Sequence, residues 1–202
     1  MLPSAFPELK GLRHTSLRRL CKDHFDMQVE DVRVLLRMPK AGYPAGCNFA
    51  AAAVLFNLIA GTSVCFYNAS PQALATSGDR GKRFKDMLIA YFPWPQAIAA
   101  KEGADAFYKY ARNPLAHALG LDVPKAPEIG VNKGPLSERK ILELEDAATL
   151  PTWAPPALRR QGPEYEIGVA GLYWGYHRVL HALFADQTHS RGAEALARDL
   201  YF

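Results

Sequence analysis

The chain of 202 residues has few cysteines and lacks the residue patterns of common cofactor sites. Its three cysteines are an odd number without a Cys-x-x-Cys pair, which argues against a disulfide framework or a structural zinc site. A reduced, cytoplasmic compartment is the simpler interpretation. The first residues contain no basic segment followed by an apolar run, so we expect no signal peptide. The glycines before Lys82 lack the spacing of a phosphate-binding loop. We expect neither a cofactor nor a metal ion.

Charged residues are missing from one long stretch, which runs from Ala41 to Gly78. Within it, residues 45–67 are numerous enough to cross a bilayer. Asparagine, threonine and serine interrupt this segment, and alanine is commoner in it than leucine. A helix that is apolar on most sides also suits the centre of a helical bundle. We therefore favour a buried helix over residues 47–67, with a membrane span as the alternative, and we expect no membrane partner.

Helical periodicity is abundant in the rest of the chain. Hydrophobic residues make up 49% of the sequence and charged residues 22%, as in ordinary globular domains. Apolar residues recur at helical spacing in several further segments, which predicts an all-α bundle. These segments are residues 8–20, 28–38, 82–92, 98–111, 137–148, 166–185 and 191–200. We expect a single helical domain over residues 1–202, with its core in residues 8–121 and 164–202.

Prolines gather in residues 122–163, which contain seven of the fifteen. This segment is too short and too rich in proline to build a core of its own, so we interpret it as a mostly irregular elaboration on the bundle. One helix is expected there, with Ser137 as its N-cap. Residues 128–134 have the turn chemistry of a small hairpin.

The net charge of +4 and the isoelectric point near 9.0 permit nucleic-acid binding without demanding it. A basic cluster at the start of one expected helix could contact an RNA backbone, or could simply be solvated. Its members are Arg80, Lys82, Arg83 and Lys85. His177 and His181 have the spacing of a helical metal site, but no third ligand accompanies them. We interpret both as core or interface residues.

The most specific pattern in the chain is Arg112-Asn113-Pro114-Leu-Ala-His117. Asparagine is a favoured N-cap, and proline suits the first position of a helix, so we expect the preceding helix to break or kink at Asn113. On a continuous helix, residues five apart point about 140° away from each other. Arg112 and His117 could then converge only through the kink, or by pairing with a second copy of the segment.

This pattern, which follows an apolar and aromatic helix, resembles the Arg-x(4–6)-His signature of HEPN domains. The resemblance covers about residues 1–121 and the closing helix, and it implies a helical bundle that cleaves RNA without a metal ion. It further implies a homodimer with Arg112, Asn113 and His117 in a composite catalytic cleft, in a toxin or defence setting. The alternative is a non-catalytic module that binds RNA, a nucleotide or a protein, including an inhibitory partner as in antitoxin-paired forms.

Overall fold

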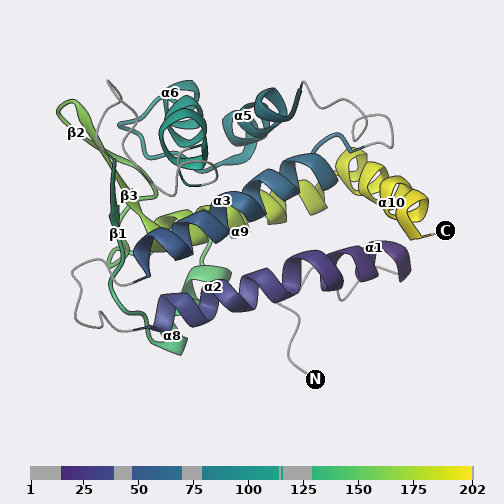
Figure 1. Cartoon of the computed structure of the whole chain (residues 1–202), viewed down its shortest axis with the longest axis horizontal. Helices are drawn as coiled ribbons and strands as arrows, with labels where there is room; N and C mark the ends of the chain where they lie inside the picture. Colours follow the sequence, from purple (N-terminus) through teal and green to yellow (C-terminus); the bar gives the residue numbers. More distant parts are fainter. Residues whose placement is uncertain (1–14, 39–46, 70–78, 114, 116–128, 202) are drawn as a thin grey trace.

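The computed structural model describes residues 15–38, 47–69, 79–113, 115 and 129–201. The protein is mostly helical, as expected, but it also contains a small three-stranded mixed sheet (Figure 1). It is therefore rich in α-helix without being strictly all-α, which corrects the expected fold class.

The first helical segment is continuous where the sequence predicted two helices. It consists of α1 (Thr15–Cys21), the π-helical turn η2 (Lys22–Asp26) and α2 (Met27–Arg37). Cys21 and Asp26, at the two junctions, both have right-handed helical dihedrals. Apolar side chains along this helix enter the core, and the buried ones include Leu17, Leu20, Cys21, Phe25, Val29, Val32 and Leu36.

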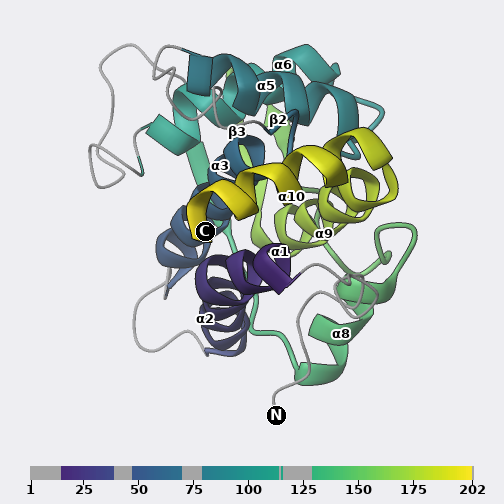
Figure 2. The same ribbon diagram turned by 90° about the vertical axis from the view of Figure 1, so that its right-hand side faces the viewer.

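Helix α3 (Asn48–Cys65) lies across the middle of the molecule, with α9 (Val169–Ala185) directly behind it (Figure 1). Above them lie α5 (Arg80–Tyr91), α6 (Ala100–Ala106) and the π-helical turn η4 (Phe107–Arg112). Aromatic contacts join these layers, and the rings of Phe56 and Phe107 meet edge to face with centroids 5.2 Å apart. Helix α10 (Gln187–Tyr201) closes the chain and packs against α1 (Figure 2).

The sheet has the order β1-β3-β2 and lies at one end of the bundle (Figure 1). Its strands are β1 (Ile129–Asn132), β2 (Arg159–Gln161) and β3 (Glu164–Gly168). Strand β1 pairs in parallel with β3, with Val131 opposite Ile167, so the hairpin expected over residues 128–134 is wrong. The hairpin is instead formed by β2 and β3, with Gly162 in the left-handed conformation at its turn (φ 62°). Strand β3 also occupies the start of the helix expected from residue 166.

The helix α8 (Glu138–Asp146) confirms the helix and the N-cap expected in the proline-rich elaboration. The Ser137 hydroxyl oxygen accepts a hydrogen bond from the Lys140 amide at 3.4 Å. The segment after α8 packs tightly on the start of α9, where a Cβ atom at Gly171 would lie 2.4 Å from the Pro155 carbonyl oxygen. Glycine is therefore required there so that the proline-rich backbone can approach the helix.

Candidate functional site

Arg112 is the last residue of the π-helical turn η4, and the helix does not end beside it. Asn113 has right-handed helical dihedrals (φ −68°, ψ −49°), and Leu115 is also helical. The expectation that Asn113 caps a new helix is therefore wrong, although a residue before proline normally avoids this conformation. Pro114 and His117 lie outside the described residues.

The Arg112 side chain lies beside two neighbours on its own helix. Its Nη1 atom donates a hydrogen bond to Oδ1 of Asn113 at 3.0 Å. Its Cζ atom lies 5.9 Å from the centre of the Tyr108 ring, within the range of a cation–π interaction. The Asn113 side chain, expected to cap the helix or orient a phosphate, thus positions the arginine. Arg112 as a residue is half-buried.

Tyr108 connects this arginine to the predicted basic cluster on α5. Its ring contacts Phe84, with centroids 5.7 Å apart, and Lys85 Nζ lies 5.9 Å from the ring centre. The tyrosine hydroxyl comes so close to α5 that a Cβ atom at Gly81 would lie 2.4 Å from the oxygen. The fold therefore brings Arg112 and Lys85 to one aromatic ring, although the two residues are far apart in sequence.

The four cations of the predicted cluster have different roles. Lys82 pairs with Asp86 (2.7 Å) and Lys85 with Asp105 (3.0 Å), while Arg80 is exposed. Arg83 instead donates hydrogen bonds to the carbonyl oxygens of Ser63 (3.3 Å), Asn68 (3.2 Å) and Tyr67. These carbonyls lie at or just beyond the C-terminal end of α3, where a cation is favourable. The arrangement gives Arg83 a structural role at the end of α3.

The sequence did not predict a buried ion pair between α2 and α8. Arg33, 8% exposed, donates from Nε and Nη2 to the two carboxylate oxygens of Glu145 at 2.7 and 2.6 Å. The Tyr173 hydroxyl of α9 donates to the same carboxylate at 2.5 Å. Burial, followed by the Glu145 charge, raises the pKa of Tyr173 well above its usual value. The only sequence signal was a charged residue inside the apolar stripe of α2.

A second cluster, also missed, surrounds His189 at the start of α10. Its Nδ1 atom accepts a hydrogen bond from the Asn68 amide (3.1 Å), and Nε2 lies 2.8 Å from the Tyr91 hydroxyl. A carboxylate oxygen of Asp186 lies 3.8 Å from the same Nε2 atom. The cluster ties α10 to α5 and to the segment after α3, and nothing in the local sequence indicated it.

His177 is a core residue, as the sequence predicted, since it is 3% exposed and its ring packs edge-on against Tyr173 at 4.7 Å. Burial, with smaller contributions from nearby Arg178, Arg33 and His181, lowers the pKa of His177 to about 3. Within the described part of the chain, no three histidine, cysteine, aspartate or glutamate side chains are grouped to hold a metal ion.

The strongest geometric feature around the HEPN-like pattern is thus a half-buried arginine, held by Tyr108 and Asn113 beside the first turns of α5. Comparison of the chain with protein-family models, with curated proteins and with solved structures finds no match in any of the three.

Proposed function

We propose that this protein is a metal-independent endoribonuclease with Arg112 and His117 as its catalytic residues. The observation that carries the proposal is the placement of Arg112 within the pattern Arg112-Asn113-x-x-x-His117. Its guanidinium contacts Asn113 and Tyr108, and the residue is half-buried. A fixed, permanently charged and planar group of this kind suits the non-bridging oxygens of a phosphodiester.

In the proposed reaction, the ribose 2′-hydroxyl attacks the adjacent phosphorus atom. The bond to the 5′-oxygen of the next nucleotide breaks and this oxygen takes up a proton from the solvent, which leaves a 2′,3′-cyclic phosphate and a free 5′-hydroxyl. His117 takes the proton from the attacking hydroxyl, and a histidine is well suited to this step because its unperturbed pKa is near 6.5. Arg112 stabilises the negative charge that develops on the phosphate oxygens.

The helical conformation of Asn113 supports a site built from two copies of the chain. Without a break at Asn113, Arg112 and His117 would point about 140° apart along a continuing helix. A two-fold pair would instead bring an arginine of one copy towards a histidine of the other. The proposal therefore includes a homodimer with a composite cleft.

The test is cleavage of single-stranded RNA in the presence of EDTA, with the ends of the products identified. We expect cyclic phosphate termini, and no cleavage of a substrate with a 2′-deoxy group at the cleavage position. Arg112→Ala and His117→Ala should each lower the rate about 100-fold or more. Lys109→Ala is the matched control, because Lys109 is an exposed cation of the same π-helical turn.

Two results would contradict the proposal. One is the absence of cleavage by the folded dimer for every RNA tried, over a range of salt and pH. The other is cleavage that His117→Ala leaves unchanged. RNA binding without cleavage, again lost in Arg112→Ala, would instead identify a non-catalytic RNA-binding module.

A further inference from the structure

One face of α5 meets the ring of Tyr108. Gly81, Phe84 and Lys85 are spaced three and four residues apart, so all three lie on the same side of the helix. A Cβ atom at Gly81 would lie 2.6 Å from the ring carbon Cζ of Tyr108, and the centre of the Phe84 ring is 5.7 Å from that of Tyr108. Lys85 Nζ lies 5.9 Å from the same ring centre. The tyrosine ring is thus packed against this face of α5.

Arg112 approaches the same ring from η4. Its Cζ atom also lies 5.9 Å from the ring centre. The guanidinium of Arg112 and the ammonium of Lys85 are therefore separated by no more than twice that distance. Two positive charges at this separation favour a ligand that presents negative charges at a similar separation. Successive phosphates of one nucleic-acid strand are such a ligand.

The ion pair of Lys85 is one that a phosphate can replace. Lys85 Nζ lies 3.0 Å from Oδ1 of Asp105, and the two side chains are 35% and 49% exposed. An ion pair with this much exposure contributes little to stability, because water solvates both charges. A phosphate oxygen accepts the same charge-assisted hydrogen bond as the carboxylate. Lys85 can therefore exchange Asp105 for a phosphate at little cost in free energy.

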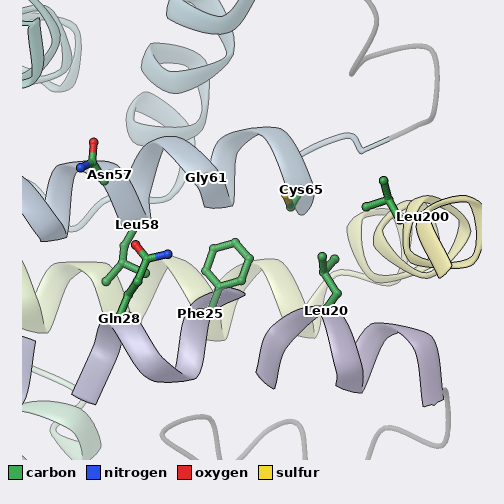
Figure 3. A pocket seen from close by; sticks show the side chains of 8 residues that line it. All are labelled: Leu20, Phe25, Gln28, Asn57, Leu58, Gly61, Cys65 and Leu200. Carbon is green, nitrogen blue, oxygen red and sulfur yellow. The ribbon is translucent and has the colours of Figure 1, made fainter. Parts of the chain in front are cut away.

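The groove between α3 and the first helix has a different character (Figure 3). Its volume is about 360 Å³, and the described side chains that line it carry no charge. They are mostly apolar, with amide groups from Gln28 and Asn57. A phosphate backbone binds where cations neutralise it, so this groove does not suit RNA. The Tyr108 ring, with a cation from each of two helical segments beside it, does.

We propose that Lys85 binds the phosphate next to the one held by Arg112, and that Tyr108 is the positioning residue for both cations. The ligand is a single strand of RNA, whose successive phosphates contact Arg112 and Lys85 in turn. Single strands are commonly bound by cations that follow the backbone beside aromatic rings. Arg83 of the same basic cluster takes no part, because its guanidinium donates to backbone carbonyls. As a second phosphate site for the Arg112 centre, this inference rests on the proposed function, but RNA binding and cleavage can be measured separately.

The test is binding of an oligouridine with 2′-O-methyl riboses, which cannot be cleaved because the attacking hydroxyl is blocked. We expect Lys85→Ala to weaken binding about tenfold and to reduce the salt dependence of the dissociation constant by about one released counterion. In cleavage of unmodified RNA, the same variant should raise KM and leave kcat unchanged. Lys82→Ala is the matched control: Lys82 is a cation of the same helix, 73% exposed and paired with Asp86, and its loss should change the dissociation constant less than about twofold.

Asp105→Asn tests the exchange with the opposite sign. It removes the carboxylate that competes with the phosphate for Lys85, so RNA should bind about threefold more tightly. The gain should disappear when Lys85→Ala is present in the same chain, because no lysine is then released. A gain that persists in the double variant would contradict the exchange.

The role of the tyrosine ring is tested without changing any charge. Tyr108→Phe keeps the ring and should bind RNA as the unaltered chain does, whereas Tyr108→Leu should weaken binding about tenfold. Gly81→Ala should act like Tyr108→Leu, because the new methyl group would displace the ring.

Unchanged binding in Lys85→Ala would overturn the inference, as would equal losses in Lys82→Ala and Lys85→Ala. Failure of the oligouridine to bind at low salt would also overturn it. Binding that depends on Lys85 without any cleavage would contradict only the proposed function. Cleavage with the same KM in Lys85→Ala as in the unaltered chain would contradict only the second phosphate site.

Discussion

The two sides of the helical bundle distribute polar and apolar groups in opposite ways. On the inner side, where α2, α8 and α9 meet, Arg33 and Glu145 are held as a buried ion pair with a tyrosine hydroxyl on the same carboxylate. On the outer side, α3 presents an uncharged face with an exposed phenylalanine and an apolar groove. Other parts of the chain bury the ion pair, whereas the apolar face of α3 is partly exposed to solvent.

This contrast separates polar groups that the chain pairs internally from an apolar face that it leaves partly exposed. The buried charges have hydrogen-bond partners on α2, α8 and α9. The elaboration and the bundle therefore supply the hydrogen bonds that each other's buried polar groups need. Covering the exposed apolar face of α3 would remove apolar surface from water and so lower the free energy of the protein. Four substitutions or changes of condition test the difference, and they follow in order of expected effect.

Glu145→Ala should have the largest effect, about 3–5 kcal/mol less free energy of unfolding. The buried Arg33 guanidinium loses two of its hydrogen bonds and keeps only the Glu30 carboxylate, and the Tyr173 hydroxyl loses its acceptor. Chemical denaturation measures the loss. Glu138→Ala is the matched control: Glu138 forms an exposed ion pair with Arg37, which is worth less than about 1 kcal/mol. Similar losses of unfolding free energy in both variants would contradict a buried ion pair between Arg33 and Glu145.

Gly171→Ala should cost about 3 kcal/mol, because the new methyl group would meet backbone atoms of Pro155, Pro156 and Ala157 within 2.7 Å. The elaboration would have to move away from α9, and we expect increased amide exchange in α8 as well. Gly134→Ala is the control, since nothing lies within 4 Å of a Cβ atom at that position.

Acid should cost about 2 kcal/mol between pH 7 and pH 5 through His177. Its pKa is about 3 in the folded protein and near 6.5 in the unfolded chain, so the unfolded state binds more protons in this range. The contribution of His177 is fully present above pH 6.5 and is lost as the pH falls towards 3. Denaturation at several pH values measures this slope, which His177→Gln should reduce.

Gly61→Ala should have the smallest effect and the opposite sign, with about 0.5–1 kcal/mol of stabilisation from helix propensity. A Cβ atom at Gly61 would lie 3.5 Å from the Phe25 ring, which is an ordinary contact. Chemical denaturation measures the gain in the free energy of unfolding. A clear destabilisation would show that the α3 face is already covered within a single chain.

Local sequence signals predicted most of the helices and little of what lies between them. A long uncharged apolar run was enough for α3, apolar spacing was enough for α5 and α9, and Ser137 marked the start of α8. The sheet was missed because β1 pairs with a strand beyond α8, and such distant pairing leaves no local pattern. The single helix through Lys22–Asp26 was also missed, since a π-helical turn shifts the apolar spacing by about one residue.

The sequence also predicted only part of the candidate site. The sequence pattern singled out Arg112 and the basic residues of α5, but it could not show that Tyr108 lies between them. It assigned Asn113 to a helix start because asparagine before proline is typical of one, whereas Asn113 follows η4 directly with right-handed helical dihedrals. Arg83 was grouped with its basic neighbours because sequence proximity does not show that a side chain reaches the carbonyls at the end of α3.

The π-helical turn η4 also constrains which deletions the chain can accept. Such a turn holds about one residue more than the α-helical turn it replaces. Removal of a single residue between Phe107 and Ala111 would restore regular α-helix and leave the later side chains close to their present orientations, because the π-helical turn already accommodates one extra residue. The same deletion in a regular stretch of α-helix would rotate every later side chain by about 100°. The π-helical turn is therefore the part of this helix where the chain length can change with the least effect on the orientation of the residues that follow.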